Sequence, residues 1–345
     1  MGHADPVLTL RATPAAPAPA DHGEGPTWDA ARGELLWVDI SAGRVRRGAL
    51  DDDGGIRDTG SLQAGDTVGV VVPAAAGGWV AAAGDAFTHL AEDGTARVLA
   101  RMPGEGGSEA DGGTRFNDGK CDRAGRFFAG TMAFDERPGA GTLYRLDTDG
   151  TVTTVLDGLT VSNGLGWSPD GRTVYLSDSG PALVHAHRYD PDTGAFSDGR
   201  VLRETGGPDG VADGLTVDDE GCLWTAMWGG GQVRRWSPEG ELLAVVEVGV
   251  AHTSSCAFAG DLLVISTAHG DDDEPDAGRL FTVRPGVSGP PAEPYRGPVT
   301  GSLSCSSARA AAASRSPASA PRWNSSAAPV RSPRSASSTP RLWWQ

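Results

Sequence analysis

The sequence predicts an all-β fold, and more specifically a six-bladed β-propeller built from four-stranded antiparallel blades. A short hairpin pattern occurs six times in the first 297 residues, and no segment shows the apolar period of an amphipathic helix. The turns of successive copies are 39 to 50 residues apart, which is the length that a propeller blade occupies.

Each copy has a glycine-containing turn followed by a run rich in β-branched and aromatic residues, as in GELLWVD and GRTVYLSD. Such a turn between two alternating runs is typical of a β-hairpin. The six turn glycines are Gly33, Gly78, Gly125, Gly171, Gly221 and Gly260. Further strand-like runs follow most hairpins, at residues 44–50, 142–147, 184–190 and 232–238. We therefore expect each unit to add outer strands to an inner hairpin.

The two ends of the repeat region predict how the ring closes. Residues 6–11 (PVLTLR) precede the first unit and residues 279–284 (RLFTVR) end the last, and both have the pattern of strands. Pairing them in one blade would remove the loose edge that a linear array leaves. We expect residues 1–20 to form an N-terminal segment that includes this closing strand, and residues 21–297 to form the six blades.

Residues 298–345 differ from the rest of the chain in composition. They hold six Arg and no Asp or Glu, so the first 297 residues carry all 45 acids against 23 bases, a net charge of −22. The tail is rich in Ser, Ala, Pro and Arg without an apolar period, which predicts disorder. The chain has one Lys against 28 Arg, as GC-rich coding favours, and we hypothesise that the tail is a frameshift product. Translation of the gene in its other two frames tests this hypothesis.

Composition also excludes several classes of function. A net charge of −16 disfavours nucleic acid and anionic membranes as partners. No run approaches the roughly 20 apolar residues of a membrane-spanning helix, and the first residues lack a signal-peptide pattern. The four Cys form no CxxC pair, so neither a zinc ribbon nor a disulfide framework is indicated. We expect a cytoplasmic protein, a monomer or weak dimer, that acts on a small molecule.

The first strand of each blade lines the axis of a propeller, so equivalent positions in different units meet in the central channel. Asn117, Asn163 and Asp213 each stand eight residues before a turn glycine, and Glu24 stands nine residues before one. Two carboxylates and two amides suit one divalent cation, with Ca²⁺, Mg²⁺, Mn²⁺ and Zn²⁺ as candidates. The alternative is that these Asn-Gly and Asp-Gly pairs are ordinary turn dipeptides.

Five segments of the sequence resemble one known family. They are GEGPTWD, RFNDGKCDRAGRFFAGTM, VSNGLGWSPDGRTVYLSDS, DGLTVDDEGCLWTAMWGGGQVRRWSPEG and HTSSCAFAGDLLVISTA. Over about residues 21–297 the chain is similar to the regucalcin, gluconolactonase and luciferin-regenerating-enzyme family, whose propellers are of the senescence marker protein type. The resemblance implies a six-bladed propeller with one catalytic divalent metal and hydrolysis of sugar lactones.

The same resemblance assigns roles to individual residues. Glu24, Asn163 and Asp213 would ligate the metal, and Asp213 would also act as acid and base. Arg115 and Asn117 would bind the hydroxyls or the ring of the lactone.

Two of these positions have alternatives. The last ligand is placed at Asp213 because it keeps the spacing to Gly221, and Asp209 in the preceding PDG sequence is the alternative. The loop AFDERPGAG supplies either Asp135 or Glu136 near the place where some members use an acid to bind substrate.

The predicted function is hydrolysis of a sugar lactone, in which the cation polarises the ring carbonyl and Asp213 moves the proton. Two other functions stay open. They are hydrolysis of another ester or of an organophosphate on the same scaffold, and calcium binding without catalysis. No serine nucleophile is indicated, because the sequence contains no GxSxG motif.

Overall fold

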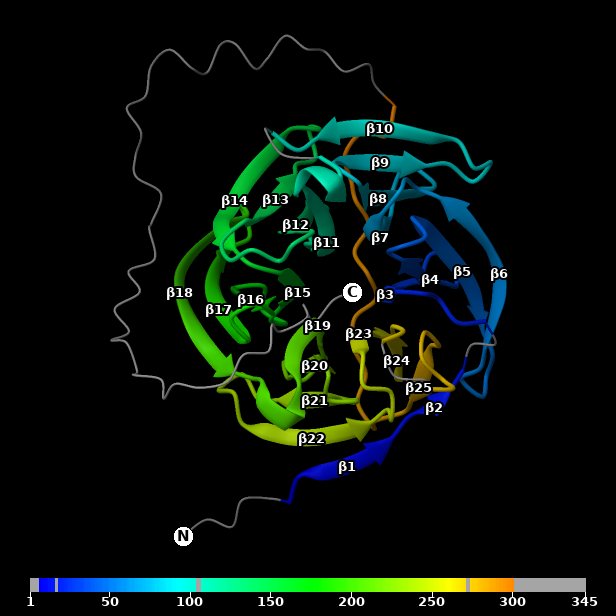
Figure 1. Cartoon of the computed structure of the whole chain (residues 1–345), viewed down its shortest axis with the longest axis vertical. Coiled ribbons are helices and arrows are strands. Elements are labelled where there is room, and N and C mark those ends of the chain that lie inside the picture. The colour runs from blue at the N-terminus through cyan, green and yellow to red at the C-terminus, as the bar shows by residue number, and fades with distance from the viewer. Residues whose placement is uncertain (1–5, 16–17, 104–106, 271–273, 301–345) are drawn as a thin grey trace. The chain divides into compact units, whose positions relative to one another are not determined.

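The computed structural model describes residues 6–15, 18–103, 107–270 and 274–300. These residues form 25 strands in six sheets arranged around a central axis (Figure 1). The only helical elements in the described ranges are two short 3₁₀ turns, η1 (Glu109–Asp111) and η2 (Gly207–Asp209). No helix in this part of the chain has the length and apolar character needed to cross a membrane. The prediction of an all-β six-bladed propeller is confirmed.

Each blade is an antiparallel sheet whose strands follow one another from the axis to the rim. Written from the inner strand outward, the blades are β3 (Gly23–Asp29), β4 (Glu34–Asp39), β5 (Arg44–Leu50) and β6 (Ile56–Gln63); β7 (Val68–Pro73), β8 (Trp79–Ala83), β9 (Ala86–Leu90) and β10 (Ala96–Arg101); β11 (Thr114–Cys121), β12 (Phe127–Ala133), β13 (Gly141–Leu146) and β14 (Val152–Leu159); β15 (Ser162–Trp167), β16 (Thr173–Asp178), β17 (Leu183–Asp190) and β18 (Ala195–Glu204); β19 (Val211–Val217), β20 (Leu223–Trp228), β21 (Gln232–Trp236) and β22 (Leu242–Glu247); and β23 (Thr253–Ala259), β24 (Leu262–Thr267) and β25 (Phe281–Val283) with β2 (Thr13–Pro14).

The six predicted turn glycines all lie between the first and second strands of their blades. Their φ angles range from 62° to 85°, a left-handed conformation that side chains other than glycine adopt only at a cost. The hairpin pattern found in the sequence is therefore the inner hairpin of each blade.

An N-terminal strand closes the ring, but the prediction of which residues do so was wrong. Residues 6–11 do not join the sixth blade, because β1 (Leu8–Arg11) pairs in parallel with β22 and adds a fifth strand to the fifth blade. The closing strand is β2, which pairs antiparallel with β25. Since β25 has only three residues, a two-residue partner covers its edge. Leu10 and Ala12 pack against the apolar cluster shared by the fifth and sixth blades.

Residues 285–299 form an extended strap that crosses the turn end of the channel (Figure 1, orange). Its backbone amides donate hydrogen bonds to turns or strand ends of four blades: Gly289 to Gly260 O, Ala292 to Trp28 O, Tyr295 to Pro73 O and Arg296 to Gly125 O. Tyr295 and Val299 are buried in the cluster between the second and third blades. Packing therefore continues two residues past the predicted boundary at Gly297. The rest of the predicted tail, from residue 301, lies outside the described residues.

Two buried histidines on β17 give the fold a predicted sensitivity to acid. His185 and His187 have ring centroids 6.0 Å apart, and His187 also lies against Phe196. Burial, with a smaller contribution from the charge of His185, lowers the pKa of His187 from 6.5 to about 4. The unfolded chain therefore binds more protons between these two pH values, and stability falls as pH falls through this range.

Replacing His187 with Gln should flatten this dependence. Between pH 7 and pH 5 we expect the parent chain to lose about 2 kcal/mol more unfolding free energy than His187→Gln. Urea denaturation of both chains at the two pH values measures the difference. An equal loss in both chains would show that His187 is not the group responsible.

Candidate functional site

Every inner strand carries a β-bulge at the same level of the channel. In each case one extra residue is inserted relative to the neighbouring strand, at the following places: Glu24 to Thr27, Val68 to Val70, Phe116 to Gly119, Ser162 to Leu165, Ala212 to Leu215 and Thr253 to Ser255. We call these six irregularities the bulge ring. A bulge bends its strand and redirects a side chain. The bulge ring therefore explains why the polar residues predicted from their spacing to the turn glycines occur at one level of the channel.

Neighbouring inner strands approach so closely at the bulge ring that some positions admit only glycine. A Cβ on Gly69 would lie 2.7 Å from Asn117 O, and one on Gly164 would lie 2.6 Å from Asp213 O. A Cβ on Gly214 would collide with Ser255 Oγ. These glycines lie inside strands, so Asn163-Gly164 and Asp213-Gly214 are not turn dipeptides.

Glu24 and Asp213 place two buried carboxylates in the channel, with side chains 3% and 1% exposed. Burial, followed by the charge of Asp118, raises the pKa of Glu24 well above its usual value. Burial, followed by the charges of Glu24 and Asp118, does the same to the pKa of Asp213. Glu24 Oε2 accepts a hydrogen bond from Gly25 N at 2.6 Å. Two buried acids this close are costly unless a cation or a proton neutralises them.

The side-chain amide of Asn163 has one atom that is hydrogen-bonded to the described part of the protein and one that is not. Its Nδ2 donates to Ser179 Oγ at 3.0 Å. Its Oδ1 is buried without a hydrogen-bond partner in the described part of the chain, and the same holds for both carboxylate oxygens of Asp213. Buried polar atoms are almost always satisfied, so these three oxygens indicate a missing positively charged partner.

Glu24, Asn163 and Asp213 therefore fit a divalent cation. Two carboxylates and an amide oxygen are hard donors of the kind that Ca²⁺, Mg²⁺ and Mn²⁺ prefer. Within the ranges that the structure describes, no group of three or more His, Cys, Asp or Glu side chains could hold a metal ion. The amide oxygen of Asn163 is thus needed to complete this set.

Arg115 and Asn117 form a pair beside the two carboxylates. Arg115 Nη1 donates to Asn117 Oδ1 at 2.8 Å and to Phe116 O at 3.1 Å. Burial lowers the pKa of Arg115 to about 10, against the opposing charges of Glu24, Glu136 and Asp213. The side-chain oxygen of Asn117, Oδ1, thus accepts a hydrogen bond from Arg115, whereas Oδ1 of Asn163 has no such partner among the described residues. Of the four residues predicted from the repeat spacing, Asn163 and Asp213 therefore keep side-chain oxygens that are unpartnered within the described chain, Glu24 accepts a hydrogen bond from Gly25 N, and Asn117 is a partner of Arg115.

The two acids of the following loop have different surroundings. Asp135 is exposed and forms an ion pair with Arg137 at 2.8 Å. Glu136 is half-buried with φ 53°, and burial raises its pKa to about 7 against the opposing charge of Arg115. Glu136 is therefore the acid that the structure brings near Arg115.

Asp209, the alternative to Asp213, has a solvent-exposed side chain. It ends the 3₁₀ turn η2 and pairs with Arg234 at 2.6 Å, with its side chain 52% exposed. Its carboxylate already has a partner in solvent, whereas that of Asp213 is buried without one.

Sequence reasoning missed an aromatic stack and one acid near these residues. Trp228 stacks on His252 at 4.2 Å between ring centroids and on His22 at 5.6 Å. The charges of Arg115 and His252, after burial, lower the pKa of His22 to about 3. Asp118 is the missed acid, and its position beside Asn117 in the RFNDGK motif was a usable signal. His252 stands eight residues before the turn glycine Gly260, which places it at the channel, but nothing in the sequence indicates that it stacks with Trp228 and His22.

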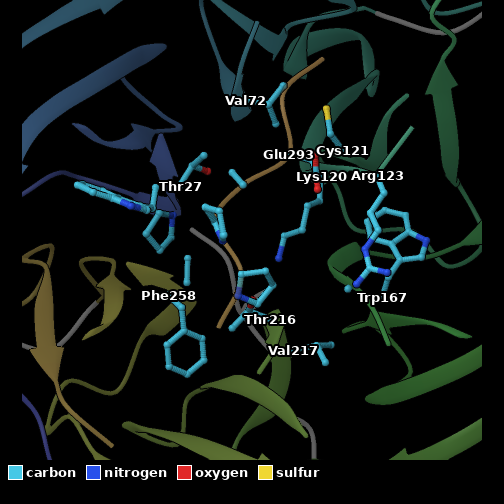
Figure 2. A pocket seen from close by; sticks show the side chains of 18 residues that line it. Thr27, Val72, Lys120, Cys121, Arg123, Trp167, Thr216, Val217, Phe258 and Glu293 are labelled. Atoms are coloured by element: carbon cyan, nitrogen blue, oxygen red, sulfur yellow. The ribbon is translucent and has the colours of Figure 1, made fainter. Parts of the chain in front are cut away.

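A separate chamber lies on the turn side of the bulge ring (Figure 2). It has a volume of about 100 Å³ and is lined by inner-strand residues and by residues 290–293 of the strap. Lys120, the chain's single lysine, projects into it and donates to Leu215 O at 3.0 Å, from the third blade to the fifth. None of Glu24, Asn163 and Asp213 lines this chamber, so it is distinct from the candidate cation site.

Comparison with known proteins gives consistent matches over the blades. Residues 22–269 match the family described as SMP-30/Gluconolactonase/LRE-like region. The chain is 38% identical over 288 residues to regucalcin of Danio rerio, which covers 80% of this chain and 95% of that protein. It is 37% identical over 254 residues to the pentonolactonase XacC of Haloferax volcanii, covering 73% and 83%.

A solved structure extends the match to the fold. The calcium-binding protein regucalcin from Agrobacterium tumefaciens superposes with a TM-score of 0.73 at 27% identity, over 84% of this chain and 99% of that one. Every predicted site residue lies within residues 22–269, the region that the family match covers.

Proposed function

We propose a function from one premise, that the chain belongs to the SMP-30/gluconolactonase/LRE-like family. The proposed activity is hydrolysis of the ring ester of a sugar lactone, an activity in line with the name of the pentonolactonase relative. The observation that carries it is the set of buried, unpartnered oxygens on Asn163 and Asp213 beside the buried carboxylate of Glu24.

In this proposal Glu24, Asn163 and Asp213 hold one divalent cation. Such a cation polarises a lactone carbonyl and stabilises negative charge on its oxygen. The donor set favours Ca²⁺, Mg²⁺ or Mn²⁺ over Zn²⁺, because zinc in proteins is bound mainly by nitrogen and sulfur.

The other roles follow from the charges of the side chains. Arg115 donates charge-assisted hydrogen bonds to substrate hydroxyls, with Asn117 and Glu136 completing the polar wall. Asp213 accepts a proton from the attacking water and returns it to the leaving alkoxide. Positioned proton transfer of this kind contributes roughly 10²–10⁴-fold to the rate. A cytoplasmic location and a monomeric or weakly dimeric state are further predictions from the sequence.

Removal of the cation should abolish turnover. A panel of aldonolactones, followed with a pH indicator against an enzyme-free control for spontaneous hydrolysis, tests the proposal. We expect activity that is lost after treatment with chelator and restored by Ca²⁺, Mg²⁺ or Mn²⁺.

Three outcomes would contradict parts of this proposal. Turnover that is indifferent to chelator would remove the role of the cation. Turnover of aryl esters or organophosphates but of no lactone would replace the substrate class. Thermal stabilisation by Ca²⁺ without turnover of any substrate would favour a calcium-binding protein without catalysis.

A further inference from the structure

We propose that Ser179 is a positioning residue that determines which atom of the Asn163 amide is offered to the cation. This inference rests on the proposed cation site but adds a residue to it. Ser179 directly follows β16, and its side chain is 3% exposed. It belongs to the fourth blade but also contacts the inner strand of the fifth.

The hydroxyl of Ser179 has one hydrogen, and that hydrogen is already used. Ser179 Oγ donates to Ala212 O at 2.6 Å, and a backbone carbonyl can only accept. Toward Asn163 the hydroxyl can therefore only accept a hydrogen bond. Asn163 satisfies it with Nδ2 at 3.0 Å.

This arrangement excludes the other orientation of the amide. Rotating the Asn163 amide by half a turn would place Oδ1 against the lone pairs of Ser179 Oγ, with no hydrogen between the two oxygens. Nδ2, a donor, would then occupy the position of the free oxygen, where it would repel a cation. The contact thus keeps Oδ1 as the unpartnered atom that the structure shows.

The surroundings hold Ser179 firmly in place. Ser179 N donates to Val161 O at 3.1 Å, and the carboxylate of the preceding Asp178 accepts from the backbone amides of Thr160 and Val161. A Cβ on Gly180 would collide with the side chain of Thr160. The turn after β16 is therefore packed tightly against the entry to β15, the strand that carries Asn163.

The same contact links two proposed ligands in different blades. Ala212, which accepts from Ser179, immediately precedes Asp213 on β19. Ser179 thus couples the orientation of Asn163 to the backbone that presents Asp213. Partners of this kind typically change metal affinity by 10- to 100-fold when they are removed.

The test compares Ser179→Ala with Ser177→Ala. Ser177 lies two residues earlier on β16, is equally buried, and its Oγ has no hydrogen-bond partner among the described residues. Titration calorimetry with Ca²⁺ on chelator-treated protein measures affinity without any assay of activity. We expect the Kd to rise 10- to 100-fold in Ser179→Ala and to change less than about twofold in Ser177→Ala.

A second background separates orientation from general damage. In Asn163→Asp both side-chain atoms are oxygens, so the orientation of the group no longer matters. We expect Ser179→Ala to change the Kd of that variant by less than about threefold. An equal effect of Ser179→Ala in both backgrounds, or no effect in the parent chain, would overturn the inference.

Failure of this inference and failure of the proposed function would give different experimental results. A parent chain that binds no divalent cation contradicts the proposed cation site itself. A parent chain that binds Ca²⁺ and hydrolyses lactones, with Ser179→Ala binding equally well, contradicts only the role of Ser179.

Discussion

We expect Asn in place of Asp213 to reduce kcat/KM for lactone hydrolysis by about a thousandfold or more. The substitution keeps the volume of the side chain but removes its charge, so it would remove both the proposed proton acceptor and a proposed anionic ligand of the cation. Loss of a general base alone is worth roughly 10²–10⁴-fold. Rates measured at saturating cation, with circular dichroism to confirm the fold, test the expectation.

Asp209→Asn is the matched control. Asp209 lies only four residues earlier, but it is exposed and paired with Arg234. We expect this variant to retain activity within about twofold, since the Asp209 side chain is half-exposed and an amide in its place can still accept a hydrogen bond from Arg234. Loss of activity in Asp209→Asn with retention in Asp213→Asn would reverse the assignment made from the spacing to the turn glycine.

Asp213→Asn should also stabilise the chain when no cation is present. Asp213 is buried without a hydrogen-bond partner in the described chain, and the charge of Glu24 adds to its raised pKa. An amide at this position removes the repulsion between two buried acids. We therefore expect cation-free Asp213→Asn to unfold at a higher temperature than the cation-free parent chain, and to gain less from added Ca²⁺.

Gly164→Ala is expected to destabilise the fold by about 3 kcal/mol or more. Gly164 follows Asn163 in the bulge of β15, and a Cβ there would lie 2.6 Å from Asp213 O and would collide with Leu215 N. Both are backbone atoms of the next blade and cannot move independently. Overpacking typically costs 1–3 kcal/mol, and the cost here is at the upper end because two inner strands must separate.

Gly33→Ala separates the effect of a close contact from that of backbone conformation. Gly33 has φ 62° but no atom within 4 Å of the added Cβ, so alanine there should cost only about 1 kcal/mol. Urea denaturation of the two variants and the parent gives both values. Equal destabilisation would show that the inner strands can move apart without a large penalty.

The fold could be predicted because its signals are local. Each inner hairpin is specified by a turn glycine and by the alternating run that follows it, both within about a dozen residues. The pairing of residues 6–11 could not be predicted in this way. Those residues pair with β22, more than 230 positions along the chain, and their alternating pattern suits the edge of either blade.

The sequence predicted which residues form the candidate site better than it predicted what each of them contacts. The repeat spacing indicated Glu24, Asn117, Asn163 and Asp213 together. The side-chain oxygen of Asn117 accepts a hydrogen bond from Arg115, whereas that of Asn163 is free within the described ranges. This difference depends on the direction of the two side-chain amides. Ser179 sets one of these directions through a contact with another blade, and no spacing in the sequence reports such a contact.

The bulge ring has a consequence for how such a protein can change. Each bulge is confined to one inner strand, and the second and third strands of every blade pair without a shift of register. A substitution of a side chain that a bulge directs into the channel can therefore alter what the channel holds without disturbing these pairings, whereas the close-packed glycines beside it, such as Gly164, admit no such change. Four blades present a carboxylate or an amide side chain at this level, while Val70 and Ser254 occupy the other two. A polar side chain at Val70 would therefore change the chemistry of the channel while the other five bulges stay as they are, whereas the hydroxyl of Ser254 is already used in a hydrogen bond to Gly23 O of the first blade.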